Sequence, residues 1–155
     1  MSSFYASPAL AGSKNPPKGP LAAEIAPGRK IQFTKVFSQE DFDRFARLTG
    51  DDNPIHVDPE FAAKTRFGKT LCHGMLLFST LNSAIRREFA RFQPEIEGIE
   101  LMFPGPTYVG DEMTIELEVV SASPESQRAQ ISATVRGPSG EPGCVAQARV
   151  FWRSA

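Results

Sequence analysis

Residues 50–56 read GDDNPIH and place a carboxylate and an imidazole, Asp51 and His56, five residues apart. The Asn53–Pro54 step favours extended or turn backbone, so the chain bends between the two side chains and can bring them together. A carboxylate beside an imidazole fixes the tautomer of the ring. Such a pair can hold one water and move its protons, which is general acid–base chemistry without a metal or a covalent intermediate.

A second segment with chemical potential is HGM, residues 73–75, at the start of a predicted helix. Backbone N–H groups in a first helical turn lack partners inside the helix, and glycine lets a ligand approach closely. The Gly74 N–H can therefore receive a carbonyl oxygen that gains negative charge. An acid–base pair and an oxyanion donor together are what an enolate-forming reaction needs.

The same residues are also compatible with roles that involve no proton transfer. On composition alone an ordinary polar turn is the simplest role, because Asp, Asn and Pro are common loop residues. A metal site is another, but the spacing of the acidic residues and histidine fits neither a calcium loop nor a zinc signature. A Cys72–His73 nucleophile lacks a third, orienting group, so we expect His73 to be a helix-terminal residue bonded to the structure and Cys72 to be buried. The arginines at 86, 87 and 91 compensate the helix dipole, with phosphate binding as the alternative.

The elements that must position these residues alternate between strands and helices. Residues 29–37 alternate as a strand, and Ser38 with Asp41 predicts a capping box for a helix that ends at Gly50. Helices are also predicted over 59–65 and 73–92, and strands over 98–103, 112–122, 128–136 and 143–152.

The predicted helix over 73–92 is apolar nearly all round in its first two turns, so protein must surround it. The last three strands form an antiparallel meander. We therefore expect an α+β fold with a sheet wrapped around one helix. A single layer leaves an exposed sheet edge, and dimerisation across that edge is a common remedy.

Size and charge restrict the class of protein. The chain has 155 residues and a formal net charge of -1, which indicates one domain and no global field for nucleic acid or anionic membrane. No apolar run approaches the roughly 20 residues of a membrane span. The cysteines, Cys72 and Cys144, have no metal-ligand spacing, and a reducing compartment is expected. Residues 1–28 are rich in proline and predict a flexible arm before a domain over 29–155. We expect a cytoplasmic location, with the mitochondrial matrix as the alternative.

Three segments together resemble the MaoC-like dehydratases, the family of (R)-specific enoyl-CoA hydratases. They read LTGDDNPIHVDPEFA (48–62), FGKTLCHGML (67–76) and MFPGPTYVGDEM (102–113). The resemblance spans residues 30–152. It implies a hot-dog fold, a curved antiparallel sheet around a long central helix, in a homodimer or a dimer of dimers. It also implies a hydro-lyase that needs no cofactor and no metal.

The implied reaction is reversible addition of water to an α,β-unsaturated acyl thioester, giving the (R)-3-hydroxyacyl product. Carried over by motif, Asp51 and His56 bind and activate the water, and which is acid and which is base stays open. The Gly74 N–H holds the thioester oxygen, and Asn53 holds the loop by side-chain hydrogen bonds. The chain departs from many relatives at Asn82, where they have a serine that orients the aspartate. An amide can also donate a hydrogen bond, or Asn82 shapes the acyl pocket.

The substrate carrier is either coenzyme A or an acyl carrier protein. Coenzyme A is favoured because the sequence has no obvious strongly basic docking patch. A hot-dog thioesterase and a non-catalytic acyl-binding subunit are the other functions considered. The Asp51/His56 pair argues against both, because it suits hydration and a binding protein has no need of it.

Overall fold

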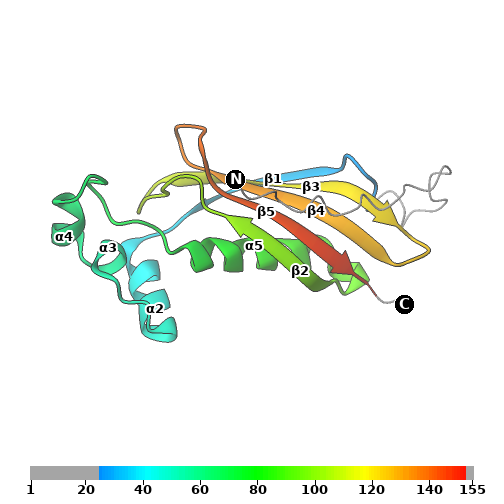
Figure 1. The fold of residues 1–155 in the computed structure, drawn as a ribbon, viewed down its shortest axis with the longest axis horizontal. Helices are drawn as coiled ribbons and strands as arrows, with labels where there is room; N and C mark the ends of the chain where they lie inside the picture. Colours follow the sequence, from blue (N-terminus) through cyan, green and yellow to red (C-terminus); the bar gives the residue numbers. More distant parts are fainter. Residues whose placement is uncertain (1–24, 153–155) are drawn as a thin grey trace, which may run out of the picture.

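The computed structural model describes residues 25–152 and contains one five-stranded antiparallel sheet with a long helix along one face (Figure 1). The strands are β1 (Lys30–Val36), β2 (Glu95–Met102), β3 (Glu112–Ser123), β4 (Arg128–Arg136) and β5 (Pro142–Phe151), in the order β1-β3-β4-β5-β2. The helices are α2 (Gln39–Thr49), α3 (Pro54–Val57), α4 (Pro59–Ala63) and α5 (Gly74–Glu88), with a 3-10 turn η1 (Ala90–Phe92). Helices α2 to α4 gather beyond one end of the sheet (Figure 1).

Strict alternation builds the sheet. In β3 the apolar residues Met113, Ile115, Leu117 and Val119 are buried, while the glutamates between them point outward. The strands β3, β4 and β5 pair in sequence, so the predicted meander is confirmed. Strand β2 begins at Glu95, three residues before its predicted start, and pairs with β5. The edges of the sheet are therefore β1 and β2.

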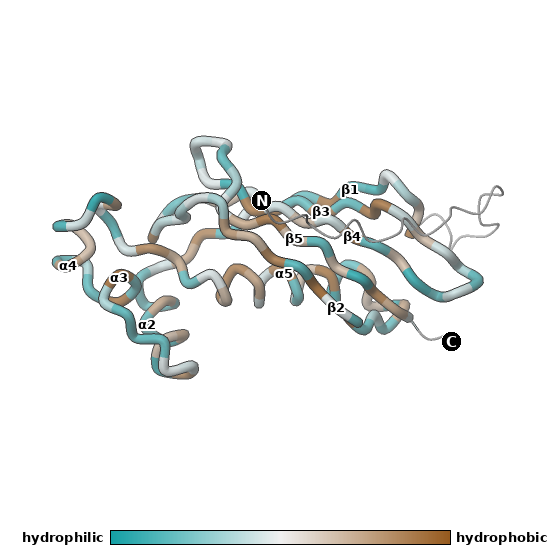
Figure 2. Tube along the Cα trace, in the orientation of Figure 1, coloured by the Kyte–Doolittle hydropathy of each residue, from teal (hydrophilic) through white to brown (hydrophobic). Residues whose placement is uncertain are grey.

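Helix α5 packs one stripe onto the sheet and leaves another side open. Its buried residues are Leu77, Leu81, Ala84 and Ile85, and they join the strand side chains in one core. Figure 2 shows hydrophobic residues along α5 and on the strands. Met75 is 50% exposed, so the expectation of a helix enclosed on every side is not met within this single chain. Among the helices of residues 25–152, none is both long and apolar enough to cross a bilayer.

The helix predicted over 73–92 ends earlier, at Glu88. The chain continues through η1 to Gln93, whose φ of 47° lies in the left-handed region. Pro94 follows, and the residue before a proline is sterically disfavoured in helical backbone. Phe89 and Phe92 are buried on this turn and attach it to the core.

The start of the domain includes the end of the predicted arm. Residues 1–24 of that arm lie outside the described residues. Ile25 is buried in the core, and the Gly28 N–H donates to the Val119 carbonyl at 2.8 Å. Residues 25–28 therefore pack against the sheet.

Helix α2 has the caps that its sequence predicts. Ser38 and Asp41 form the reciprocal capping box, and Gly50 ends the helix in the left-handed region with φ 80°. The sequence predicts extended or turn backbone around the Asn53–Pro54 step, and this is wrong from Pro54 onward, because Pro54–Val57 form one helical turn. Pro54 occupies the first helical position, where its missing N–H costs nothing. A single turn is too short to produce a hydrophobic period.

The capping box should contribute measurably to stability. We expect Ser38→Ala to lower the free energy of unfolding by about 1 kcal/mol, because the Asp41 N–H loses its side-chain acceptor. Ser83→Ala, at an exposed serine on α5, is the matched control and should stay within about 0.5 kcal/mol of the parent. Urea denaturation followed by circular dichroism measures both, and equal midpoints for the two variants would contradict the assignment.

Candidate active site

The side chains of Asp51, His56 and His73 meet at the N-terminal end of α5. A carboxylate oxygen of Asp51 and one ring nitrogen from each histidine all lie within 4.8 Å of one another. The bend predicted between Asp51 and His56 is thus present. A separation of this size leaves room for one water that hydrogen-bonds both groups at about 2.8 Å each.

The position of His56 determines its tautomer. Its Nδ1 lies 2.8 Å from the Leu71 carbonyl oxygen. A carbonyl oxygen only accepts, so Nδ1 must carry the proton and donate it. The lone pair of a neutral His56 ring is then on Nε2, where it can accept a proton from water.

Helix α2 and the segment before α5 hold α3 in place. The Gln39 side-chain amide donates to the His56 carbonyl oxygen at 2.9 Å, and its Oε1 accepts from the buried Thr70 hydroxyl at 2.7 Å. The Leu71 N–H donates to the Ile55 carbonyl at 3.0 Å. His56 is therefore fixed through its own backbone as well as through its ring.

His73 lies fully buried behind the pair. It is the N-cap residue of α5, and its Nε2 lies 3.0 Å from the Asp51 carbonyl oxygen. Its ring stacks on the His56 ring with centroids 4.1 Å apart and an interplanar angle of 25°. Burial lowers the pKa of His73, opposed by the Asp51 carbonyl and reinforced by His56. The expectation that His73 is a helix-terminal residue bonded to the structure is confirmed.

Gly74 is the first residue of α5 and follows His73 directly. Its N–H is in the first turn, where donors have no intrahelical partner. A Cβ added at this position would lie 2.9 Å from Cζ of Phe103. Glycine therefore lets the Phe103 ring close over the start of the helix, next to the Asp51/His56 pair.

The two asparagines have different positions. Asn53 is the N-cap of α3, and its Oδ1 accepts from the Ile55 N–H at 3.2 Å, which holds the loop. Asn82 is half-buried on α5, eight residues after Gly74. Within residues 25–152 no hydrogen bond joins Asn82 to Asp51, so the structure does not bring these two side chains into direct contact.

The histidine geometry also bears on metal binding. The atoms of Asp51, His56 and His73 are close enough for an ion. Lone pairs of imidazoles lie in the ring planes, however, and stacked rings direct them side by side rather than to one point. One nitrogen of each ring is already engaged by a backbone carbonyl. Asp58, an acidic residue two positions after His56, caps α4 by accepting from the Phe61 N–H at 2.9 Å. The arrangement suits proton transfer better than coordination.

Cys72 does not have the environment of a nucleophile. It is buried, and burial raises the pKa of its thiol to about 12. Reactive cysteines have a lowered pKa, because the thiolate is the attacking species. Cys144 is also buried, with its pKa raised by burial to about 11.

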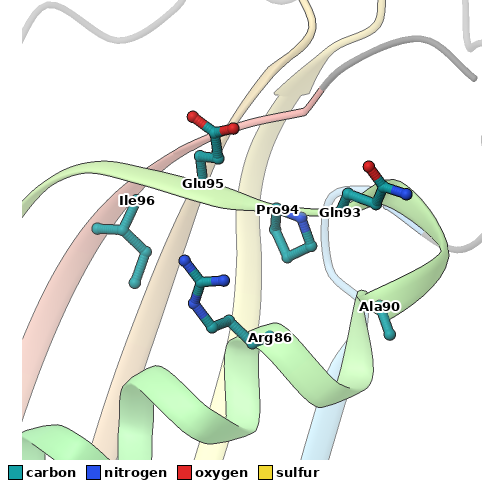
Figure 3. Close-up of a pocket in the computed structure, with 6 residues that line it drawn as sticks. All are labelled: Arg86, Ala90, Gln93, Pro94, Glu95 and Ile96. Carbon is teal, nitrogen blue, oxygen red and sulfur yellow. The ribbon is translucent and has the colours of Figure 1, made fainter.

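A pocket of about 560 Å³ opens at the opposite end of α5 (Figure 3). Its lining residues are Arg86, Ala90, Gln93, Pro94, Glu95 and Ile96. Since α5 has 15 residues, this pocket lies about 20 Å from the Asp51/His56 pair. Arg86 and Arg87 occupy the last turn of α5, where cations offset the helix dipole.

Three residues that position the pair were missed from the sequence. Gln39, Thr70 and Leu71 fix His56, and Leu71 does so through its backbone carbonyl. No local spacing signals such a role, because the bonded partners are 15 to 31 residues apart in the chain.

The sequence is similar to that of known proteins. The family model described as the MaoC like domain matches residues 22–138. The (R)-specific enoyl-CoA hydratase of Aeromonas caviae is 33% identical over 114 residues, covering 74% of this chain and 85% of that protein. The 3-hydroxyacyl-thioester dehydratase Z of Mycobacterium tuberculosis is 31% identical over 128 residues, covering 74% and 82%.

Solved structures agree with the predicted fold. The (R)-hydratase from A. caviae involved in PHA biosynthesis superposes with a TM-score of 0.78 at 31% identity, covering 83% of this chain and 97% of that chain. Unliganded R-hydratase PhaJ1 from Pseudomonas aeruginosa gives a TM-score of 0.79 at 29% identity, covering 86% and 85%. The expected hot-dog fold is confirmed by this likeness and by the five-stranded sheet around α5.

The lowered pKa of His73 predicts how stability depends on pH. The unfolded chain binds a proton at this ring more readily than the folded chain, so folding is favoured at neutral pH. This contribution is lost as the pH falls through about 6.5 towards the lower pKa of the folded state. We expect the free energy of unfolding to fall from pH 7 to pH 5.5 less steeply in His73→Gln than in the parent. Urea titrations at both pH values measure this, and identical slopes would contradict burial of a neutral ring.

Proposed function

This chain belongs to the MaoC-like domain family, and from that premise we propose that it is an (R)-specific enoyl-thioester hydratase. It adds water reversibly to a trans-2-enoyl-CoA and gives the (R)-3-hydroxyacyl-CoA. One observation carries the proposal. The Asp51 carboxylate and a ring nitrogen of His56 lie within 4.8 Å of each other, and the Nδ1–H···O bond to Leu71 leaves the lone pair of His56 on Nε2.

The geometry supports a division of labour within the pair. His56 Nε2 accepts a proton from the water while the Asp51 carboxylate accepts the second hydrogen bond and orients the oxygen. The new C–O bond forms at the β-carbon, and the π electrons move to the thioester oxygen, held by the Gly74 N–H. The pair then delivers one proton to the α-carbon, which completes the addition of one water.

The carrier of the acyl chain is proposed from the named relatives. The named relatives include a hydratase of enoyl-CoA and a dehydratase of 3-hydroxyacyl thioesters. We keep coenzyme A as the carrier and an acyl carrier protein as the alternative. Asn82, half-buried on α5 and not hydrogen-bonded to Asp51 within residues 25–152, is proposed to line the acyl pocket. The free thiols Cys72 and Cys144 support a reducing compartment, which fits the cytoplasm or the mitochondrial matrix.

A homodimer is the assembly that the surface supports. Met75 and Phe103 form an apolar patch in which each side chain is 45% to 50% exposed. They lie together because the Phe103 ring lies against Gly74, which directly precedes Met75. The patch continues the open edge of β2. Exposed apolar patches next to an unpaired edge strand are typical of protein interfaces.

The activity test uses loss of the conjugated enoyl absorbance on crotonyl-CoA. We expect Asp51→Asn and His56→Gln each to lower turnover at least ~100-fold, because each removes a proton acceptor. Asp52→Asn is the matched control, since it removes an exposed carboxylate from the same loop, and it should keep turnover within about threefold. Full activity of either site variant would contradict the assignment. Thiol release without loss of the double bond would indicate a thioesterase, and neither change with any chain length would indicate a binding subunit.

The molar mass in solution tests the proposed homodimer separately from the activity. Light scattering should give twice the 17.0 kDa chain for the parent protein. Met75→Lys should shift the population towards the single chain, because a charge buried in an apolar interface is costly. Val120→Lys, at an apolar residue of β3 that is 47% exposed, is the control and should keep the parent mass. A parent protein that is monomeric at all concentrations would refute the homodimer.

A further inference from the structure

His73 contacts both members of the Asp51/His56 pair, although it belongs to neither the loop nor the helix that carries them. Its Nε2 hydrogen-bonds the Asp51 carbonyl oxygen at 3.0 Å, and its ring stacks on the His56 ring with centroids 4.1 Å apart. Asp51 is exposed and His56 is half-buried, whereas His73 is fully buried. The buried ring is therefore the fixed member of the three.

The contact to Asp51 acts on the backbone. Thr49 and Gly50 close α2, and Asp51 follows immediately in a segment without regular structure. The Asp51 carbonyl accepts a hydrogen bond from His73 Nε2, and the Asp51 N–H donates to the Thr49 hydroxyl at 3.3 Å. Holding this carbonyl fixes the Cα of Asp51, and hence the point from which its carboxylate reaches the water.

The contact to His56 acts on the ring. His56 has one in-plane restraint, the bond from Nδ1 to the Leu71 carbonyl. A single hydrogen bond leaves the ring free to tilt about that bond. The His73 ring, inclined by only 25°, closes one face of His56 and limits this tilt. The direction of the Nε2 lone pair is thereby restricted.

The surroundings of His73 keep the ring neutral and still. Two phenylalanines of α2 pack against the His73 ring. The ring centroid of Phe42 lies 5.9 Å from that of His73, in an edge contact, and the ring centroid of Phe45 lies 4.9 Å away. The ionisable groups that face it are Asp51 and His56, from the loop and from α3. Its Nδ1 is buried and has no hydrogen-bond partner among residues 25–152. A proton there would be desolvated and unpaired at the positive end of α5.

We propose that His73 is a positioning residue for hydration, which fixes Asp51 through a backbone hydrogen bond and His56 through ring stacking. The inference rests on the proposed hydratase function for its activity measurement. His73 touches no reacting atom. Its effect is on turnover, through the alignment of the pair, and a displacement of about 1 Å at such a site can cost on the order of 100-fold.

Three substitutions separate the two contacts. His73→Gln retains an N–H donor near the Nε2 position but loses the ring, and His73→Phe retains the ring but loses the donor. His73→Asn loses both. We expect turnover on crotonyl-CoA to fall ~10-fold in the first two variants and ~100-fold in the third, with KM within about threefold of the parent. Cys72→Ala is the control for a general packing defect, because Cys72 is buried next to His73 and its thiol donates to the His73 backbone carbonyl.

The chain has only two histidines, so nitrogen NMR of histidine-labelled protein reports each ring directly. In the parent we expect opposite tautomers, with the proton on Nε2 of His73 and on Nδ1 of His56. His56 should keep its tautomer in His73→Phe and become a mixture in His73→Gln, where the stacking partner is gone. A purely structural role for His73 would leave the His56 signal unchanged in both variants.

The outcomes separate this proposal from the proposed function. A proton on Nδ1 of His73 in the parent, or parent-like turnover in His73→Asn, overturns the positioning role. If the variants do not fold, the parent spectrum alone decides, since the bond to Asp51 requires the Nε2 proton. A parent protein that is inactive on enoyl-CoA of every chain length refutes the hydratase. The tautomers then still test whether His73 fixes the pair.

Discussion

The hydrogen bond from His56 Nδ1 to the Leu71 carbonyl is the interaction on which the site depends. It joins α3, beyond the end of the sheet, to the segment that leads into α5. The same segment is bonded to the loop between β2 and β3, through the Cys72 N–H to Thr107 and the Val109 N–H to Thr70. These three hydrogen bonds together connect α3, which carries His56, with the segment that leads into α5 and with the loop between two strands of the sheet.

The core supplies what this contact needs, which is a fixed α5. Leu77, Leu81 and Ile85 anchor the helix on the sheet, and the first turn projects past the core towards α3. The helix therefore has two functions along its length. Its middle completes the hydrophobic core, and its first residue offers a backbone donor beside the acid–base pair. Displacement of the helix along its axis would alter both at once.

Local patterns predict most of the fold and the proximity of Asp51 and His56. Alternation identifies β3, β4 and β5, and the Ser38/Asp41 box and Gly50 identify both ends of α2. Asp51 and His56 are found because a proline turn joins them within five residues. Helix α3 is missed because one turn has no period, and Leu71 is missed because any residue has a carbonyl. The role of Gln39 is also hidden, since its partner Thr70 is 31 residues away.

The position of α2 to α4 beyond the sheet has a consequence for local unfolding. These helices bury few side chains, Phe42, Ala46 and Ala62, and of these only Phe42 belongs to the main core that the sheet and α5 form. Regions with little buried apolar area open at a lower free energy than the core around them. The three helices and the sheet are then two cooperative units of unequal stability, and the reacting pair lies on the boundary between them. Opening of the weaker unit separates Asp51 and His56 from α5 while the rest of the protein stays folded.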